Sequence, residues 1–395
     1  SLMSTAESYT PQDLEDLDQI RESVISLCSD FPGEYWREKD KDSSYPTEFV
    51  NALTKSGFIS CLIPEEYGGS GLKITHAGAI LEQIHKCGCN GAAVHAQMYI
   101  MGTVLRHGNE EQKSRWLPKI ASGDLRLQAF GVTEPTSGTD TLSLRTTAEK
   151  KGNKYIINGQ KVWTSRAEYS DLMLLLARTT PKEEVKKKTD GLSVLVVDMQ
   201  KAKNNGLTIK PLRTMMNHSS CEVFFDDMEV PVENLIGEEG KGFKYILSGM
   251  NAERILIAHE CIGDGDWFIE KAVNYANDRK VFGRPIGQNQ GIQFPISKAY
   301  AALRAANMMV VESARKFDAG ENCGPEANMA KMLASEAAWQ AAEMCVQTHG
   351  GFGFAAEYDI ERKFRETRLY QVAPVSTNLI LSYISEHVLG LPRSY

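Results

Sequence analysis

The hydrophobic pattern of this 395-residue sequence changes its period twice, and this change constrains the fold more than any other feature. From about Gln12 to Ser122, apolar residues recur at three- and four-residue spacings, which is typical of amphipathic helices. From Gln128 to Gly237 the chain instead contains short β-rich runs separated by Gly, Asn and Asp. Four helical stretches follow, at about 243–276, 289–317, 326–348 and 376–388.

This order predicts an α+β protein of three domains, which suits a chain too long for one compact domain. We expect an N-terminal all-α domain over residues 9–125, a middle β-sheet domain over 126–238 and a C-terminal four-helix bundle over 239–395. The predicted strands are the runs KYIING, DLMLLLART, LSVLVVDM, LTIKPL and EVFFDDMEV. The charged stretch 182–190 is expected to be a loop between two of them.

Composition and charge exclude several classes of protein. With 42% hydrophobic and 24% charged residues, the sequence is typical of a soluble globular protein. A net charge of −7 argues against a broad nucleic-acid surface. The longest apolar run, 172–177, is far too short to span a membrane, and the start of the chain has neither a signal-peptide core nor an Arg-rich transit pattern. We therefore expect a cytoplasmic protein that binds neither nucleic acid nor membrane.

The eight cysteines are scattered, and only Cys87 and Cys89 lie close together in the sequence. No spacing among them resembles a zinc site, so no metal is expected. Reduced, mostly buried thiols are the interpretation that fits best.

Two glycine-containing segments are candidate ligand sites. In GVTEPTSGTD (131–140), Thr133 and Thr139 can donate hydrogen bonds, and backbone N–H groups near Gly138 can approach a planar or phosphate-bearing ligand. Taken alone, this segment fits a polar surface turn better. The segment GFGFAA (351–356) formally fits a dinucleotide fingerprint, but a predicted helix, not a strand, precedes it, so a Rossmann fold is excluded.

The first of these segments is one of five blocks that resemble, in the same order, segments of the acyl-CoA dehydrogenase family. The others are YIINGQKVWTS (155–165), VPVENLIGEEGKGF (230–243), RKVFGRPIGQNQ (279–290) and QTHGGFGF (347–354). Because the blocks cover all three predicted domains, the chain is identified as a member of that family.

The resemblance implies FAD bound without a Rossmann fold, between the β domain, the bundle and a second subunit. It places Thr133 on the pyrimidine edge of the flavin, the Ser165 hydroxyl near N5, and Gly138 and Thr139 towards the phosphates. The residues implied to line the flavin ring are Phe130, Val132, Thr133, Trp163 and Ser165. Those implied to hold the adenine half from the partner subunit are Arg279, Phe282, Gln290, Gln347, Gly350 and Gly351. Ser376 and Asn378 match further FAD contacts, and Thr139, Met250 and Arg254 are implied to contact substrate.

The segment LYQVAPVSTNLI (369–380) resembles the stretch that carries the catalytic glutamate in many family members. Here no carboxylate lies between Glu366 and Glu386, and Pro374 takes the glutamate's place. Glu366 itself is expected to be a structural ion-pair partner. Since proline has no N–H to polarise a thioester carbonyl, either Val375 donates instead or the enzyme depends more on a ribityl hydroxyl of FAD.

A second family solution puts the base on the helix that begins near Gly242, in an L-x-x-E-R pattern. Glu253 occupies that place, in GMNAER, and its neighbours one helical turn away include Met250, Leu256 and Ile257. A carboxylate in an apolar stripe is costly unless it is paired or functional. A salt bridge to Arg254 is the alternative, but the resemblance favours Glu253 as the base.

The resemblance implies an FAD-dependent acyl-CoA dehydrogenase that passes electrons to an electron-transfer flavoprotein and assembles as a homotetramer, a dimer of dimers. A branched or medium-to-long acyl-CoA is the expected substrate. An enoyl-CoA reductase, a flavin-dependent oxygenase and a non-catalytic acyl-CoA- or FAD-binding protein are the alternatives. Glu253 argues against the last two, which have no need of a base there, whereas a reductase would use the same group.

Overall fold

The computed structural model describes residues 9–394, which form two compact units, each assembled from separate parts of the chain. Of these residues, one unit takes 9–42, 73–91 and 251–394, and the other takes 43–72 and 92–250. The expectation that the chain starts without a targeting segment rests partly on residues 1–8, which lie outside the described part. Within the described part, no helix is long and apolar enough to cross a membrane.

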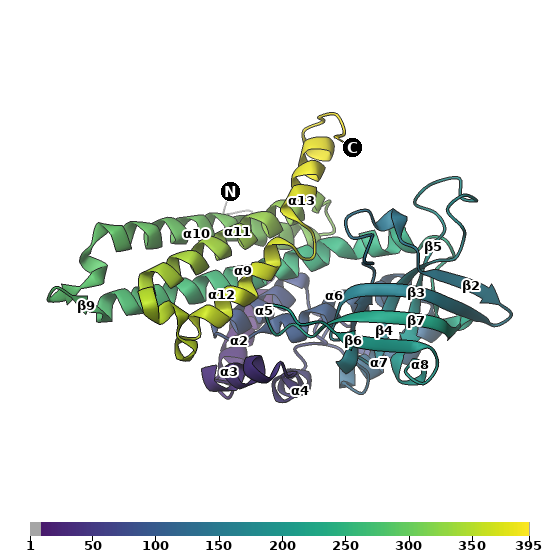
Figure 1. Ribbon diagram of the computed structural model, residues 1–395, viewed down its shortest axis with the longest axis horizontal. Coiled ribbons are helices and arrows are strands. Elements are labelled where there is room, and N and C mark those ends of the chain that lie inside the picture. Colours follow the sequence, from purple (N-terminus) through teal and green to yellow (C-terminus); the bar gives the residue numbers. More distant parts are fainter. Residues whose placement is uncertain (1–8, 395) are drawn as a thin grey trace. The chain divides into compact units, whose positions relative to one another are not determined.

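The unit of residues 43–72 and 92–250 contains one mixed sheet (Figure 1). Its strands are β1 (Leu127–Gly131), β2 (Thr147–Lys151), β3 (Lys154–Ser165), β4 (Leu172–Arg178), β5 (Leu192–Asp198), β6 (Leu207–Pro211), β7 (Ser220–Pro231) and β8 (Leu235–Ile236). Their order is β6-β7-β3-β2-β4-β5-β8, with β1 parallel to β4. All five predicted strand runs are confirmed, and residues 182–190 form the connection between β4 and β5.

Strand β4 is apolar throughout because both of its faces are buried. Leu172, Leu174 and Leu176 pack in one cluster with residues of α6 (His95–His107) and α7 (Glu110–Ser122). The alternate residues, such as Met173 and Leu175, pack on the other face with β3 and β7. Helix α4 (Thr47–Lys55) and the short α8 (Met199–Ala202) complete the unit.

The other unit is helical. Its elements are α2 (Pro11–Cys28), α3 (Gly33–Asp42), α5 (Ile74–Lys86), α10 (Gln290–Asp318), α11 (Gly324–His349), α12 (Ile360–Arg368), α13 (Thr377–Tyr383) and the part of α9 (Gly242–Asp278) from residue 251 onward. A two-stranded hairpin of β9 (Lys280–Val281) and β10 (Arg284–Pro285) joins α9 to α10. Helix α5 crosses α9 closely at Gly263, where an added Cβ would lie 2.2 Å from the carbonyl oxygen of Glu82.

The predicted order of helices, sheet and helices is confirmed, with two differences in detail. The stretch 376–388 is not one long helix, because α13 ends at Tyr383 and a π-helical turn, Ile384–Val388, follows it. Helix α12 was not predicted. The bundle therefore consists of three long helices, α9, α10 and α11, accompanied by the short α12 and α13.

A buried charged network ties α5, α9 and α12 together. His85 lies 2.6 Å from Glu260 and 2.8 Å from Asp264, and Lys363 lies 2.6 Å from Asp264. The Tyr370 hydroxyl donates to Glu260 at 3.0 Å. Burial lowers the pKa of His85, but the two carboxylates outweigh it and raise this pKa to about 9.

This pKa predicts how stability depends on pH. A histidine whose folded pKa is about 9 and whose unfolded pKa is about 6.5 stabilises the fold fully below pH ~6.5, and that stabilisation disappears as pH rises through about 9. We expect deprotonation of this single group to lower the free energy of unfolding by about 3 kcal/mol as the pH rises through that range. Denaturant titrations at pH 6.5 and 9 measure it. His85→Gln should lose this pH dependence, whereas His387→Gln, which changes an exposed imidazole, should keep it. If the free energy of unfolding of His85→Gln depends on pH as steeply as that of the wild type, His85 is not the group responsible.

Candidate active site

The segments GVTEPTSGTD and YIINGQKVWTS meet at the end of the sheet. The Val162 N–H donates to the Thr133 carbonyl at 2.9 Å, so Thr133 lies directly beside the end of β3. Trp163 is 60% exposed and has a φ of 59°, in the left-handed region that a bulky side chain rarely adopts. An exposed indole held in a costly conformation offers a flat apolar surface for a planar ligand.

A buried ion pair supports this surface from below. The Lys161 ammonium donates to the Glu134 carboxylate and to the Val132 carbonyl, each at 2.9 Å, and both side chains are buried. The backbone N–H groups of Arg145 and Thr146 donate to the same carboxylate. Burial alone would raise the pKa of Glu134, but Lys161 and the two amides outweigh it, and this pKa lies below its usual value. Burial lowers the pKa of Lys161 to about 8, so the pair is charged at neutral pH.

The remaining predicted contacts of this unit lie nearby on the chain. Phe130 and Val132 are half-buried, as is Ser165 at the end of β3. Gly138 and Thr139 are exposed on a tight turn, in which Glu134 and Ser137 exchange backbone hydrogen bonds of 3.1 Å. A Cβ added to Gly138 would meet only the Thr133 methyl group, at 3.8 Å, so a ligand can approach the backbone there.

Glu253 lies on α9, and its side chain is almost fully buried at 9% exposure. Burial lowers the pKa of the neighbouring Arg254, and the charge of Glu253 opposes that shift. Lys331, on α11, is fully buried. Burial and the charge of Arg254 lower its pKa, and the charge of Glu253 raises it. The predicted apolar stripe is confirmed, since Leu256 and Ile257 are buried on the same helix.

The turn that follows α12 is held by Lys331. Burial lowers the pKa of Lys331 to about 8, and its ammonium donates to the Val375 carbonyl at 2.7 Å. In the described part of the chain, no hydrogen bond is made by the Val375 N–H. Val375 therefore has a fixed carbonyl and an amide that is available as a donor, next to Pro374, which has none.

Glu366 is a structural residue, as predicted. Its carboxylate accepts a hydrogen bond from Arg362 at 3.0 Å and lies 3.9 Å from Lys363. The partner is Arg362, one turn earlier on α12, and both side chains are buried.

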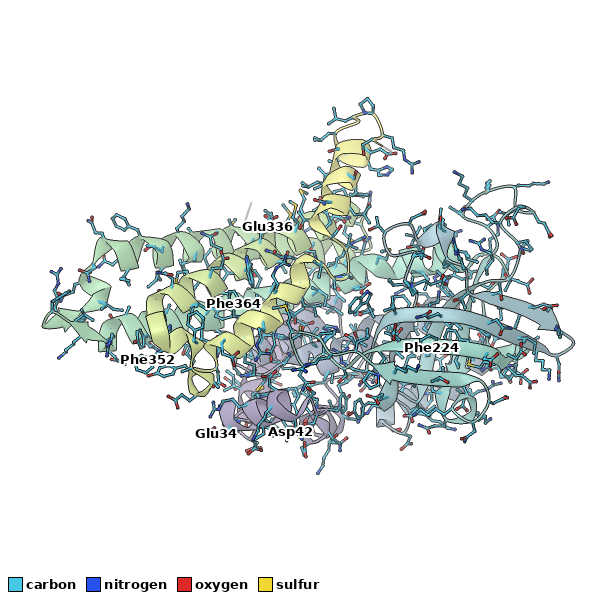
Figure 2. All side chains as sticks on the ribbon, in the orientation of Figure 1. Glu34, Asp42, Phe224, Glu336, Phe352 and Phe364 are labelled. Atoms are coloured by element: carbon cyan, nitrogen blue, oxygen red, sulfur yellow. The ribbon has the colours of Figure 1, made fainter. Side chains whose placement is uncertain are left out.

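Arg279 and Phe282 lie at the opposite end of α9 from Glu253. With a rise of about 1.5 Å per residue, the helix separates Arg279 from Glu253 by about 39 Å. The Arg279 guanidinium lies over the Phe352 ring, 6.0 Å from its centroid, at the end of the bundle that carries the β9–β10 hairpin (Figures 1 and 2). Phe282 is fully exposed with a φ of 51°.

Four other predicted FAD contacts are open to solvent. Gln290, at the start of α10, and Gln347, near the end of α11, are exposed. Gly350 and Gly351 follow α11 directly, and a Cβ on either would meet nothing within 4 Å. A helix and not a strand precedes GFGFAA, which confirms that this segment is not a dinucleotide fingerprint.

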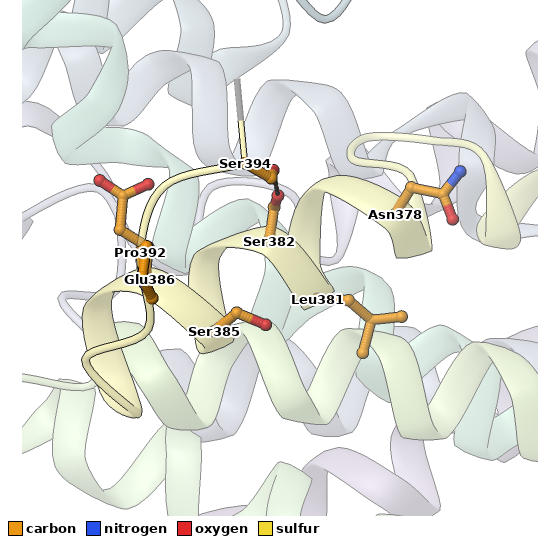
Figure 3. Close-up of a pocket in the computed structure, with 7 residues that line it drawn as sticks. All are labelled: Asn378, Leu381, Ser382, Ser385, Glu386, Pro392 and Ser394. Carbon is orange, nitrogen blue, oxygen red and sulfur yellow. Dashed lines mark hydrogen bonds between the residues drawn. The ribbon is translucent and has the colours of Figure 1, made fainter.

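Ser376 and Asn378 lie at the start of α13. The Ser376 hydroxyl accepts the Leu379 N–H at 3.4 Å and so caps the helix. Asn378 lines a groove with polar residues of α13 and of the chain end, including Ser382 and Ser394 (Figure 3). The structure thus brings together Thr133, Trp163 and Ser165 in one unit, and Glu253, Arg254 and Lys331 in the other.

Comparison with known proteins shows the family. Models of the acyl-CoA dehydrogenase N-terminal, middle and C-terminal domains match residues 14–124, 129–228 and 240–389. The chain belongs to the acyl-CoA dehydrogenase family. Its members are FAD-dependent oxidoreductases, so this chain is an oxidoreductase of that kind with FAD as its cofactor.

Relatives in this family extend over nearly the whole chain. An acyl-CoA dehydrogenase of Bacillus subtilis is 36% identical, over 89% of this chain and 92% of its own length. Acyl-CoA dehydrogenase FadE12 of Mycobacterium tuberculosis is 32% identical, over 96% and 98%. A 3-(aryl)acrylate reductase of Clostridium sporogenes is 32% identical, over 89% and 93%. The solved structure of a glutaryl-coenzyme A dehydrogenase bound to glutaryl-CoA is 28% identical, with a TM-score of 0.88 over 98% and 97% of the two chains.

Three supporting residues of this acyl-CoA dehydrogenase family member were not predicted from the sequence: Glu134, Lys161 and Lys331. Glu134 and Lys161 belong to the segments that resemble the family, so a role for each could have been sought there. Lys331 had a signal of its own, because it is a single lysine in the small, apolar stretch NMAKMLASEAAWQAA. A lone cation in such a helix face needs a buried acceptor.

Proposed function

We propose that this chain catalyses the α,β-dehydrogenation of an acyl-CoA thioester to the trans-2-enoyl-CoA, with Glu253 as the base for the α-proton. The observation that carries the proposal is the placement of Glu253. It is a nearly buried carboxylate on α9, and its charge raises the pKa of Lys331 against the lowering by burial. Lys331 in turn donates to the Val375 carbonyl, in the turn where other family members carry their glutamate.

Glu253, Val375 and Lys331 have separate roles in the proposed reaction. Glu253 removes the α-proton, and its burial favours a proton affinity high enough for this task. The Val375 N–H donates to the thioester carbonyl and stabilises the negative charge that develops on it. Lys331 fixes the Val375 carbonyl and so keeps the amide in place. Bound FAD would supply the acceptor for the β-hydride.

The residues that would hold the flavin ring are Trp163, Thr133 and Ser165: Trp163 would supply an apolar surface, and Thr133 and Ser165 would supply hydrogen-bonding hydroxyls. The separation of about 39 Å along α9 supports the assignment of Arg279 and Phe282 to the FAD of a neighbouring subunit. Arginine suits a pyrophosphate because its planar fork makes paired hydrogen bonds. The assembly that follows is a homotetramer built as a dimer of dimers. Light scattering that finds an FAD-loaded monomer would refute it.

The proposed substrate is a branched or medium-to-long acyl-CoA, with Met250, Arg254 and Thr139 among its contacts. Electrons pass to an electron-transfer flavoprotein, and the enzyme works in the cytoplasm. A strong preference for butyryl-CoA over isovaleryl- and octanoyl-CoA would count against this substrate class.

Turnover with a defined acyl-CoA panel tests the reaction. FAD-loaded protein is incubated with butyryl-, isovaleryl- or octanoyl-CoA and an artificial electron acceptor, and the thioester is analysed by mass spectrometry. We expect a product with two hydrogens fewer and one acceptor reduced per product. Absence of that product with every thioester, while FAD remains bound, would refute dehydrogenation.

The relation to the 3-(aryl)acrylate reductase favours one second candidate, reduction of an α,β-unsaturated acyl substrate. Glu253 would then return the proton that it removes in the forward direction. Chemically reduced enzyme mixed with a 2-enoyl-CoA separates the two candidates. Reoxidation of the flavin far faster than its reduction by the saturated thioester would favour the reductase.

A further inference from the structure

Cys28 and Cys87 lie at the same end of two neighbouring helices, α2 and α5. The helices start side by side, because Lys73 pairs with Asp13 at 2.8 Å and His76 Nε2 lies 3.3 Å from the Asp13 carbonyl. At about 1.5 Å per residue, each helix extends about 21–22 Å from that ion pair to its own cysteine. The two cysteines therefore lie at about the same distance from that ion pair, at neighbouring helix ends.

Contacts at this end of the helices place a third cysteine there. The carbonyl of Cys28 accepts the Phe31 N–H at 3.0 Å, and the carbonyl of Phe31 accepts the Cys89 thiol at 3.6 Å. Cys28 and Cys89 are buried, whereas Cys87, which caps α5, is exposed. The Gln83 side-chain amide donates to the Cys87 sulfur at 3.5 Å.

The charge on these sulfurs is unequal. The neighbouring Cys28 thiol lowers the pKa of Cys87 to about 6 against the opposing effect of partial burial, and Gln83 and Lys86 add to the lowering. Cys87, Cys89 and burial together raise the pKa of Cys28. An exposed thiolate and a buried thiol are thus adjacent at neutral pH. The other buried thiols outside this cluster have pKa values raised by burial: Cys61, Cys221, Cys261, Cys323 and Cys345.

We propose that Cys87 and Cys28 form a reversible dithiol–disulfide site that reacts with peroxides. The Cys87 thiolate attacks one oxygen of hydrogen peroxide, the O–O bond breaks, and hydroxide leaves and takes a proton to become water. Cys87 is then a sulfenic acid. The Cys28 sulfur attacks it, the S–S bond forms, and the hydroxyl group leaves as a second water with the Cys28 proton. Two thiols are oxidised by two electrons, and one peroxide is reduced to two waters.

Peptide mapping of the intact, FAD-loaded protein tests the site. The protein is treated with hydrogen peroxide, blocked with iodoacetamide and digested with trypsin. We expect the peptide of residues 22–37, which contains Cys28, to be linked to the peptide of residues 87–106, and dithiothreitol to release it. Because Cys87 and Cys89 share the second peptide, Cys87→Ser should abolish the link and Cys89→Ser should preserve it.

Alkylation kinetics provide a second measurement that needs no oxidant. At pH 7 a thiol with a pKa of about 6 is roughly 30-fold more ionised than one with the ordinary value of about 8.5. The rate of Cys87 alkylation should therefore reach half its maximum near pH 6 in the wild-type protein and at higher pH in Cys28→Ser. After peroxide, Cys28→Ser should carry a sulfenic acid at Cys87 that dimedone traps.

Cys323→Ser, which changes a buried cysteine outside the cluster, is the matched control and should leave the link and the alkylation profile unchanged. Retained FAD in each variant confirms that folding is intact. The proposal is overturned if the link persists in Cys87→Ser, if peroxide oxidises Cys87 while Cys28 stays free, or if alkylation of Cys87 is half-maximal near pH 8.5.

Discussion

Replacing Glu253 by Gln is expected to slow flavin reduction by acyl-CoA by at least about 10²–10⁴-fold, the usual range for a general base. The substitution keeps the size and polarity of the side chain but removes the carboxylate that we propose accepts the α-proton. Folding and FAD content should survive, and acyl-CoA should still bind and perturb the flavin spectrum. Stopped-flow absorbance under anaerobic conditions measures the rate, and a spectral titration measures the binding.

Two other glutamates serve as controls. Glu270 lies on the same helix, α9, but is exposed, so Glu270→Gln should reduce its flavin at the wild-type rate. Glu366→Gln removes a buried partner of Arg362 and is expected to lower stability while leaving the reduction rate of the folded enzyme intact. If Glu253→Gln reduces flavin at near wild-type rate while Glu366→Gln does not, the base is misassigned.

The second large effect is expected for Lys161→Met. This change leaves the Glu134 carboxylate buried with only two amide donors, and breaking a buried pair on one side typically costs about 3–5 kcal/mol. It also removes the donor to the Val132 carbonyl, which precedes Thr133. We therefore expect the free energy of unfolding to fall by about that amount and FAD to bind more weakly. Denaturant titration and flavin release measure the two effects.

Lys154→Met is the matched control. Lys154 pairs with Glu229 on the same sheet, but both side chains are about two-fifths exposed, at 40% and 43%. Exposed pairs contribute about 0–1 kcal/mol, so this variant should be nearly as stable as the wild type. A Lys161→Met protein with equal stability and equal FAD affinity would show that the buried pair does not support the Val132–Thr133 segment.

The fold could be predicted from the sequence where buried residues are apolar. The runs that became β4 and β5 are almost entirely hydrophobic because two clusters cover their faces, and the period of the flanking helices is equally clear. Helix α12 was missed for the opposite reason. Apart from Ile360, its buried residues are polar or charged, namely Arg362, Lys363, Glu366 and Thr367, and ion pairs and hydrogen bonds satisfy them. Hydrophobic periodicity cannot reveal a helix whose inner face is charged.

Some features of the candidate site could likewise be predicted from the sequence and others could not. That Glu253 is buried could be predicted because a carboxylate in an apolar stripe is conspicuous in the sequence, whereas its role as the base comes from the resemblance and stays a prediction. The hydrogen-bond partners of Lys161 and Lys331 could not be predicted, since each acceptor is distant along the chain. Lys161 reaches the Val132 carbonyl and Lys331 reaches the Val375 carbonyl, and only the folded chain brings these groups together. The sequence also left open which amide replaces the one lost at Pro374, and the unbonded Val375 N–H in the described structure supports Val375.

Anaerobic mixing of the FAD-loaded protein with an acyl-CoA deuterated at the α-carbon tests the central claim most directly. The flavin absorbance should bleach in one phase without added acceptor, and the thioester should become the 2-enoyl-CoA. Deuterium at the α-carbon should slow this phase relative to the unlabelled substrate, because in the proposed reaction Glu253 removes that hydrogen as a proton. A flavin that stays oxidised while acyl-CoA is bound, across the panel of butyryl-, isovaleryl- and octanoyl-CoA, would contradict the account.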